Sequence, residues 1–334
     1  MPIRFARRTL GVLFLVPALL AACAAPSSSS LESRVQARVA RATQLAGEDL
    51  KPLLGLCRPQ PATRASGHTV DEVIRRLIAQ RPPAPGRVFD NLYFVGSAWV
   101  SAWVLKTSQG LILIDALNSE EEARTIIEGG MATLGLDPRD IRYIVVTHGH
   151  GDHYGGASYL AQRHGARIVA SEEDWAMMTG TLEFASAVWP PPPKRDIAVR
   201  DGDKLVLGDT TLSYHLTPGH TLGTLSLVFE VRDGTRQHRA LLWGGTAFNF
   251  GKDMPRLQAY HASTEKMRRL AADRSIDVML SNHPGYDSTV EKLADLKRGS
   301  TAGAHPFVGG VGAVDRSLAI MGECSLAQHD RFSM

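Results

Sequence analysis

The feature that most constrains this chain is a string of three histidines and one aspartate within six positions. His148, His150, Asp152 and His153 directly follow an apolar run at residues 143–146 that is typical of a buried strand. Burying so many imidazole and carboxylate groups together is costly unless something holds them. Imidazole nitrogens and carboxylate oxygens on a loop after a strand are ligands that zinc accepts. The string therefore predicts a metal site at the end of a strand.

The spacing within the string lets its side chains face one space. His148 and His150 alternate along the chain, so in an extended segment both rings point to the same side. The glycines at 149 and 151 are expected to let the backbone turn sharply. Asp152 and His153 would then face back into the same space from the start of the next helix.

The rest of the chain predicts a layered α/β fold with sheet between helices, because strand-like and helix-like segments alternate on both sides of the string. The strand-like segments are residues 91–95, 100–107, 111–116, 167–170, 204–207, 211–216, 225–231, 240–243 and 278–281. The helical segments lie near residues 119–134, 154–164, 263–272 and 290–296. The stretch after residue 300 is rich in glycine and weakly patterned, and no element is predicted there.

The start of the chain predicts an export signal. Arg4, Arg7 and Arg8 precede an apolar stretch at residues 10–22 that is too short to span a bilayer comfortably. The sequence Leu-Ala-Ala-Cys that ends at Cys23 resembles the lipobox of bacterial lipoproteins. This resemblance implies lipidation of Cys23 and a periplasmic protein anchored to the membrane, the outer one in preference to the inner one. A plain cleavable signal that leaves no anchor stays open as the alternative.

Composition breaks divide the chain into four parts. The predicted parts are a signal at residues 1–22, a tether and N-terminal helical extension at 23–86, a catalytic domain at 87–300 and a C-terminal tail at 301–334. Helices are expected within the extension at residues 31–46 and 69–79. The proline-rich stretch at residues 81–86 marks the start of the main domain.

Charge and cysteine content restrict the partners and leave one question open. The formal net charge of +3 falls to zero when the three arginines of the signal region are set aside, which argues against a nucleic-acid partner. Beyond Cys23 the chain contains Cys57 and Cys324. An oxidising periplasm would permit these two to pair, and two unpaired buried thiols are equally compatible with the sequence.

The histidine string resembles the hallmark of the metallo-β-lactamase superfamily, and further motifs follow in the order expected for it. His220 lies in a Pro-Gly-His-Thr motif and His283 in an Asn-His-Pro-Gly-Tyr motif, which resemble the next two ligand motifs. Asp115 ends a Leu-Ile-Asp motif that resembles the early acidic one, and it is expected to orient a ligand loop. The resemblance covers about residues 88–298. It implies an αββα four-layer sandwich with metals at the shared edge of two sheets.

Carried over residue by residue, the resemblance implies two Zn²⁺ ions. The implied ligands are His148, His150 and His220 for the first ion and Asp152, His153 and His283 for the second. Two dications held by a single carboxylate keep most of their charge, so a bridging water should ionise near neutral pH and attack a carbonyl. Asp152 would act in catalysis as well, because it would orient that hydroxide.

One departure from the family pattern narrows the expected substrate. Glyoxalase II-like thioesterases and acyl-homoserine lactonases place a metal-bridging aspartate where this chain has Thr246. Neutral threonine is a poor bridge between two zinc ions. β-Lactamases also lack that aspartate, and those of the third subclass use the six ligands given above. The resemblance therefore favours an exported zinc β-lactamase of the kind that confers antibiotic resistance. A hydrolase of another ester, lactone or amide is the alternative, followed by a non-catalytic envelope lipoprotein.

The substrate side of the site has weaker signals. Thr246 and Asn249 could hydrogen-bond a substrate carboxylate, although neither brings a charge; Asn249 stands where some β-lactamases keep a lysine. Trp99 and Tyr286 could form an apolar wall, and Tyr154 could donate to a developing oxyanion. Ordinary packing is the alternative for these three aromatic residues. The chain is expected to be a monomer that takes a small-molecule substrate. Structural roles are predicted for His164, His215, His238, His261, His305 and His329.

Overall fold

The structure of the chain is a computed structural model that describes residues 28–299 and 305–334. The predicted export signal and the predicted lipidation site Cys23 lie outside the described residues. Among the helices of the described ranges, none has the length and apolar character needed to cross a membrane.

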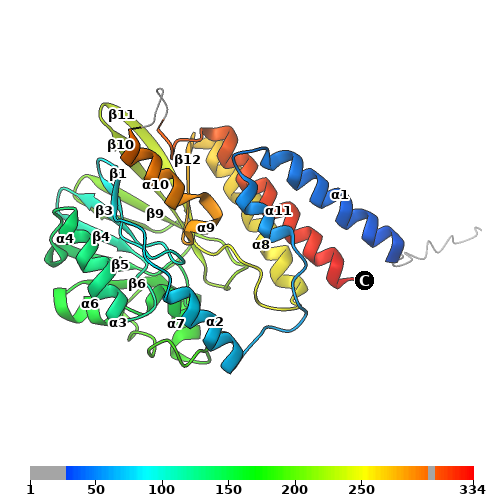
Figure 1. The fold of residues 1–334 in the computed structure, drawn as a ribbon, viewed down its shortest axis with the longest axis horizontal. Coiled ribbons are helices and arrows are strands. Elements are labelled where there is room, and N and C mark those ends of the chain that lie inside the picture. Colours follow the sequence, from blue (N-terminus) through cyan, green and yellow to red (C-terminus); the bar gives the residue numbers. More distant parts are fainter. Residues whose placement is uncertain (1–27, 300–304) are drawn as a thin grey trace, which may run out of the picture.

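Two mixed β-sheets stack at the centre of the molecule (Figure 1). The first sheet has seven strands in chain order, antiparallel from β1 to β4 and parallel from β4 to β7. The second has the order β12-β11-β10-β9-β8 and is antiparallel except for the pair β11 and β12. The strands are β1 (Gly86–Phe89), β2 (Leu92–Phe94), β3 (Trp103–Thr107), β4 (Gly110–Ile114), β5 (Ile141–Val145), β6 (Arg167–Ser171), β7 (Ile197–Val199), β8 (Lys204–Leu207), β9 (Thr210–Leu216), β10 (Leu225–Asp233), β11 (Arg236–Trp243) and β12 (Val278–Ser281).

The central strands are apolar on both faces because each face meets another layer. Successive side chains of a strand point to opposite sides. In β4, Leu111 and Leu113 pack against the covering helices, whereas Ile112 and Ile114 pack between the two sheets. This explains the continuous apolar run of β4, which a strand with one solvent face would not need.

Helices cover the outer face of each sheet. The elements on or near the first sheet are α3 (Glu120–Glu122), η2 (Ala123–Glu128), α4 (Gly129–Thr133), η3 (Pro138–Asp140), α5 (Gly151–Tyr154), α6 (Ala157–His164) and α7 (Glu172–Thr179). The elements packed on the second sheet are α1 (Ser28–Ala46), η1 (Lys51–Cys57), α8 (Met254–Asp273) and α11 (Val311–Phe332). The remaining helices are α2 (His68–Ile78), α9 (Pro284–Asp287) and α10 (Thr289–Arg298). Two mixed sheets flanked by helices confirm the predicted αββα sandwich.

The C-terminal helix α11 occupies a stretch where the sequence pattern predicts no element. It lies between α1 and α8 (Figure 1), so it is buried on more than one side and lacks a simple polar face. Gly322 permits the close approach to α8, because a Cβ there would lie 2.7 Å from the hydroxyl oxygen of Thr264. A disulfide joins Cys57 in η1 to Cys324 in α11. The pairing that the sequence left open is therefore present, and it ties the N-terminal extension to the C-terminal helix.

Candidate metal centre

Loops at the strand ends of both sheets bring the six predicted ligands together. His148 and His150 follow β5, and the short helix α5 carries Asp152 and His153. The other two ligands come from the second sheet, since His220 follows β9 and His283 follows β12. Residues that are 70 or more positions apart in the sequence thus come into contact at the edge where the two sheets meet.

The first group contains three imidazole nitrogens. The Nε2 atom of His220 lies 3.0 Å from Nε2 of His148 and 3.1 Å from Nδ1 of His150. Nitrogens bound to one tetrahedral zinc at the usual bond length are separated by about 3.3 Å. The three atoms therefore converge with the spacing of a metal site, and no hydrogen-bonding role explains three ring nitrogens that face one another.

The second group combines two imidazoles with a carboxylate. The Nε2 atoms of His153 and His283 are 3.3 Å apart. The Oδ2 atom of Asp152 lies 3.4 Å from Nε2 of His153 and 3.8 Å from Nε2 of His283. His148 also lies within reach of Asp152 and His153. Two adjoining His/Asp groups are consistent with a binuclear metal site.

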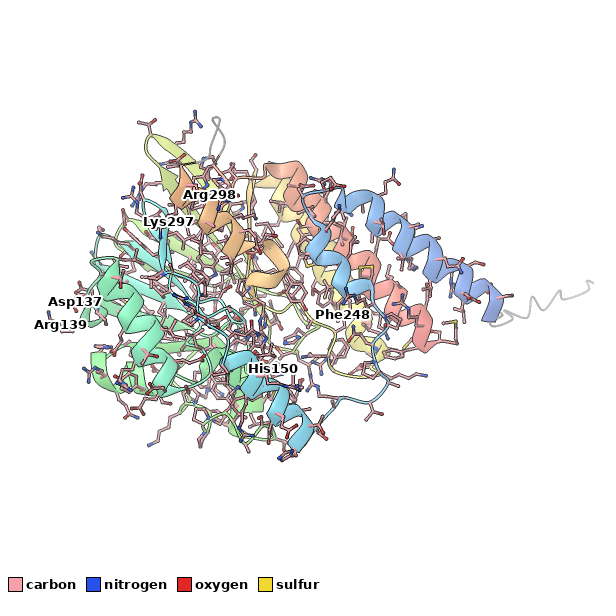
Figure 2. All side chains as sticks on the ribbon, viewed as in Figure 1. Asp137, Arg139, His150, Phe248, Lys297 and Arg298 are labelled. Atoms are coloured by element: carbon pink, nitrogen blue, oxygen red, sulfur yellow. A yellow bond between two sulfur atoms is a disulfide. The ribbon has the colours of Figure 1, made fainter. Side chains whose placement is uncertain are left out.

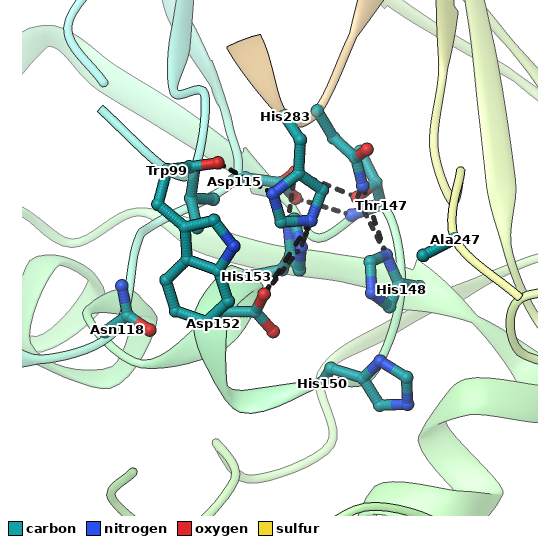
Figure 3. A network of polar contacts seen from close by, with 12 residues as sticks. Trp99, Asp115, Asn118, Thr147, His148, His150, Asp152, His153, Ala247 and His283 are labelled. Carbon is teal, nitrogen blue, oxygen red and sulfur yellow. Dashed lines mark hydrogen bonds and ion pairs between the residues drawn. The ribbon is translucent and has the colours of Figure 1, made fainter. Parts of the chain in front are cut away.

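Hydrogen bonds on the outer side of four rings orient the donor atoms, and Figure 3 shows the one between His283 and Trp99. Each bond is 2.7 Å long; the pairs are Nδ1 of His148 with the carbonyl of Gly244, of His220 with the carbonyl of Ala247, of His283 with the carbonyl of Trp99, and of His153 with Oδ2 of Asp115. Carbonyl and carboxylate oxygens only accept, so each Nδ1 carries the proton. When the ring is neutral, the lone pair of Nε2 is therefore left facing the cluster, as metal binding requires.

His150 is oriented the other way. Its Nδ1 atom faces the first group, and its buried Nε2 atom has no hydrogen-bond partner among the described residues. Its ring meets the ring of Phe184 edge to face, with centroids 5.8 Å apart. The ring of His150 is therefore held by packing against Phe184, whereas the other four imidazoles are held by a hydrogen bond to an oxygen acceptor.

Asp115 links the ligand loop to the first sheet. Its Oδ1 accepts from the backbone N–H of Thr147 at 2.8 Å, and its Oδ2 accepts from the Thr147 hydroxyl at 2.8 Å and from His153 at 2.7 Å. It follows β4 directly and has a φ of 61°, a conformation that a residue other than glycine adopts only when its surroundings hold it there. The carboxylate thus lies beside the loop that the sequence analysis expects it to orient.

Burial and neighbouring charges set the protonation of the ligands. Burial lowers the pKa of His148 and of His150 well below the usual histidine value, and it lowers the pKa of His220 to about 3. Burial acts on His153 in the same direction, but the carboxylates of Asp152 and Asp115 outweigh it and raise the pKa of His153 to about 10. The pKa of Asp152 is well below its usual range, because the charge of His153 overcomes the effect of burial. Without metal, His148, His150 and His220 are therefore neutral and Asp152 is ionised, which are the forms that bind metal, whereas His153 is protonated and must release a proton when a metal ion binds.

Known proteins resemble this chain in sequence and fold. A family model described as the metallo-β-lactamase superfamily matches residues 100–236. A solved subclass B3 metallo-β-lactamase of Bradyrhizobium japonicum is 30% identical, with a TM-score of 0.57, over 71% of this chain and 90% of that chain. The chain belongs to the metallo-β-lactamase superfamily. It is accordingly a metallo-hydrolase of that fold with a His/Asp metal site, and such an enzyme takes a small-molecule substrate.

Further superfamily members differ in what their names state. A solved B3 metallo-β-lactamase with an active-site glutamic acid is 27% identical with a TM-score of 0.61, over 83% of this chain and 97% of that chain. Curated hydroxyacylglutathione hydrolases match a shorter region. The one from Rhodopseudomonas palustris (strain CGA009) is 34% identical over 36% of this chain and 40% of its own length, and the one from Anaeromyxobacter dehalogenans is 31% identical over 49% and 53%. The chain thus spans about half or less of the curated relatives it matches.

The chain turns at the first glycine of the histidine string, as expected. The N–H of His150 donates to the carbonyl of His148 at 3.0 Å across Gly149, although neither Gly149 nor Gly151 has a positive φ. The two glycines also allow close packing. A Cβ on Gly149 would lie 2.5 Å from Cε of Met177, and one on Gly151 would lie 2.2 Å from Cγ of Trp189. The end of a methionine side chain can move aside, whereas the indole next to Gly151 leaves room only for a residue without a side chain.

Asp174 supports the centre and is not singled out by the sequence analysis. This carboxylate of α7 is 1% exposed. It accepts from the N–H of Gly149 at 2.7 Å, the hydroxyl of Thr221 at 3.0 Å and the N–H of Gly223 at 3.1 Å. Burial raises its pKa to about 7. Asp174 therefore joins the loop of His148 and His150 to the loop of His220. No spacing pattern could have identified it, because its partners lie 25 to 49 positions away.

Replacing Asp174 with alanine should weaken the first metal group without removing a ligand. The change leaves the N–H donors of Gly149 and Gly223 without an acceptor, which costs about 1–3 kcal/mol for each buried group. We expect the zinc dissociation constant to rise about 10–100-fold, measured by competition with a chromophoric chelator. Glu173→Ala, at an exposed position of the same helix, is the matched control and should leave zinc affinity unchanged. Equal zinc affinities for the two variants would contradict this role.

The centre opens into a cavity of about 530 Å³. His150, Asp152, His220 and His283 form part of its wall. Of the residues predicted to bind substrate, Trp99, Asn249 and Tyr286 also line this cavity. The aromatic wall expected from the sequence is thus next to the metal ligands.

The structure does not bring Thr246 or Tyr154 into the cavity. Thr246 is 2% exposed and lies behind the wall, with its hydroxyl 3.4 Å from the hydroxyl of Ser281. Tyr154 is also 2% exposed and packs in the core between the first sheet and its helices, where burial raises the pKa of its phenol to about 12. Neither residue is among those that line the cavity, because packing takes up both side chains.

Helix α2 forms a wall of the cavity, although it lies outside the catalytic domain predicted from the sequence. The lining side chains are Val70, Val73, Ile74 and Leu77. Their spacing of three, four and seven positions defines one face of a helix. Val73 is 42% exposed, although it is apolar. This apolar stripe is visible in the sequence and could have indicated that the helix packs at the site, because a helix that only connects domains needs no apolar face.

The histidines predicted to be structural all lie outside the two metal groups found in the described residues. Four of them have other partners. These are His164 with Glu128, His238 with Asp277, His305 with the carbonyl of Val88 and His329 with Gln258.

Proposed function

We propose that the chain is a zinc-dependent hydrolase that opens the β-lactam ring. The observation that carries the proposal is the pair of donor groups, which together hold five imidazoles and one carboxylate. Position 246 contributes no further carboxylate, because it is a threonine, whose hydroxyl lies 3.4 Å from that of Ser281. This donor set differs from the one expected for thioesterases and lactonases of the fold. Similarity to a B3 metallo-β-lactamase over 90% of that chain favours the same assignment.

The residues at the centre fit zinc in number, spacing and protonation, as their mutual distances and outer hydrogen bonds indicate. When bound, zinc polarises a carbonyl and makes an attacking water acidic enough to ionise near neutral pH. Asp152 keeps its negative charge beside His153 and lines the cavity, so its carboxylate can orient a water molecule and accept its proton. Asp115 holds His153 in the tautomer that this arrangement needs.

The cavity suits a compact amide substrate of drug size. Its volume of about 530 Å³ lies within the usual range for such ligands. Trp99 and Tyr286 face the apolar stripe of α2, so the body of the substrate would be held between apolar surfaces. These surfaces exclude bulk water from the carbonyl under attack and strengthen the electrostatic interactions there.

Zinc-loaded protein is expected to hydrolyse a chromogenic cephalosporin, measured by absorbance. EDTA should abolish turnover, and added zinc should restore it, because the attacking water ionises near neutral pH only when it is bound to the metal. Elemental analysis should give near two zinc ions per chain. Protein that holds this zinc but turns over no penicillin, cephalosporin or carbapenem would refute the substrate assignment. Absence of zinc after expression in zinc-replete medium would favour a non-catalytic protein instead.

A second candidate is hydrolysis of a thioester. The observation in its favour is the 34% identity to a hydroxyacylglutathione hydrolase over 121 residues. Thr246 argues against it, as does the limited coverage of 40% of that relative. Testing S-lactoylglutathione beside the β-lactams decides between the two candidates on the same protein sample.

A further inference from the structure

The segment between η1 and α2 delivers an arginine to the edge of the cavity. Arg64 donates through Nε to the carbonyl of Asn249 at 2.7 Å and through Nη1 to the carbonyl of Glu183 at 2.8 Å. Its third nitrogen, Nη2, is buried and has no hydrogen-bond partner among the described residues. A buried N–H group of a cation that lacks a partner is costly, so its presence points to an acceptor that is not part of the chain.

Arg64 lies beside the metal centre. Its guanidinium stacks on the ring of Phe184, with Cζ 5.0 Å from the ring centroid. Phe184 in turn meets His150, and both of these rings line the main cavity. Arg64 itself lines a side pocket of about 180 Å³ that shares Val70, Phe184 and Asn249 with that cavity. Figure 2 shows His150 of the main cavity next to α2 and Phe248 of the side pocket nearer η1.

The charge of Arg64 is not balanced by a carboxylate. The nearby acid is Glu183, but its Oε2 lies 2.9 Å from Nη1 of Arg256. Arg256 also donates to the carbonyls of Gly219 and His220, so its position is fixed. Arg64 donates to the main-chain oxygen of Glu183, and no hydrogen bond joins it to the carboxylate of that residue. Burial, and then the charge of Arg256, lower the pKa of Arg64, although an arginine stays protonated. Two guanidinium groups and one carboxylate leave one positive charge at this edge.

We propose that Arg64 binds a carboxylate of the substrate in the side pocket. A guanidinium matches a planar carboxylate better than any other cationic side chain, and such charged hydrogen bonds are strong. This inference rests on the proposed function and adds a specificity determinant to it. The preferred substrate then has an apolar body against α2 and an anionic group at Arg64. This proposal also replaces the expectation that only the uncharged residues Thr246 and Asn249 recognise the substrate carboxylate.

The test compares a chromogenic cephalosporin that carries its free carboxylate with the methyl ester of the same compound. For zinc-loaded wild-type protein, the KM of the ester should exceed that of the acid by about tenfold. Arg64→Gln should raise the KM of the acid by about tenfold and leave its kcat within about twofold, because the contact acts on ground state and transition state alike. The KM of the ester should not change in this variant.

Matched variants keep the result interpretable. Arg64→Lys retains the charge but lacks the two-pronged donor of a guanidinium, so it should give a KM for the acid between those of the wild type and Arg64→Gln. This variant provides the test if Arg64→Gln does not fold. Arg58→Gln, at an exposed position of the same segment, should behave like the wild type. Zinc content and Tm are measured for each variant, since a merely structural role of Arg64 would raise the KM of acid and ester equally.

The failure of this inference is distinct from the failure of the proposed function. If zinc-loaded protein leaves both compounds intact, titration calorimetry with the same pair measures their binding directly. Tighter binding of the acid than of the ester, lost in Arg64→Gln, would then sustain the anion site and refute only the β-lactamase activity. Equal KM or Kd values for acid and ester in the wild type, or no detectable binding of the acid, would overturn the inference.

Discussion

Replacing Asp152 with alanine is expected to lower kcat/KM by at least about 1000-fold. This loss is larger than the 10–100-fold typical of residues that only support a ligand. Asp152 supplies the sole carboxylate of the second donor group, and its charge offsets that of His153. Bound zinc should fall from about two ions per chain to about one, measured by elemental analysis after dialysis. The residue thus affects metal content and turnover together.

The fold should survive this substitution. Asp152 lies at the margin of the core, and His153 keeps its 2.7 Å contact with Asp115. We expect the Tm of the metal-free variant to stay within about 5 °C of the wild type. Asp140→Ala, an exposed acid in η3 just before the strand that leads to the site, is the matched control. Turnover at the wild-type rate in the Asp152 variant would refute the role assigned to this carboxylate.

Removing the disulfide should produce the largest change in stability. The bond between Cys57 and Cys324 joins residues 267 positions apart. Closing a loop of that length restricts the unfolded chain by an amount worth about 5 kcal/mol, and measured losses for native disulfides are about 2–5 kcal/mol. The variant with both cysteines changed to serine should therefore show a Tm lower by roughly 5–15 °C.

The same variant should bind substrate less well while it keeps its zinc. None of the six ligands lies on η1 or α11, whereas Arg64 and α2 follow Cys57 directly. We therefore expect a higher KM and an unchanged zinc content. TCEP should lower the Tm of the wild type to a similar extent and should have no further effect on the variant. Equal Tm values for wild type and variant, with thiol titration showing that Cys57 and Cys324 are both free in the wild type, would contradict the pairing. A stable disulfide also agrees with the proposed periplasmic location.

Much of the fold could be predicted from local patterns. The buried strands β4 and β5 are continuous apolar runs, and the period of their side chains needs only a few neighbouring residues to be recognised. The edge strands β1 and β7 were missed because they have four and three residues and pair on one side only. The first half of α8 was missed as well. Asp253 caps its N-terminus and Pro255 lies in its first turn, which is typical of a helix start, but the apolar pattern there is weak.

The site residues also differ in whether the local sequence is enough to predict them. His148, His150, Asp152 and His153 could be identified because all four lie on one loop. His220 and His283 could be assigned only through the resemblance to a family. Arg64 could not be assigned at all, since its partner Asn249 is 185 positions away and nothing in either local sequence indicates the contact. Every residue type has a main-chain oxygen, so a long-range contact with such an oxygen cannot be predicted from the residue types in the sequence.

The carbonyl groups that orient the imidazoles affect how the substrate selectivity of such an enzyme can evolve by mutation. His283 and His220 are held by the main-chain oxygens of Trp99 and Ala247, and the side chains of these same two residues line the cavity. Every amino acid supplies that oxygen, so mutation at either position alters the shape offered to a ligand and spares the alignment of the donors. Selectivity can therefore diverge while the underlying reaction is inherited intact.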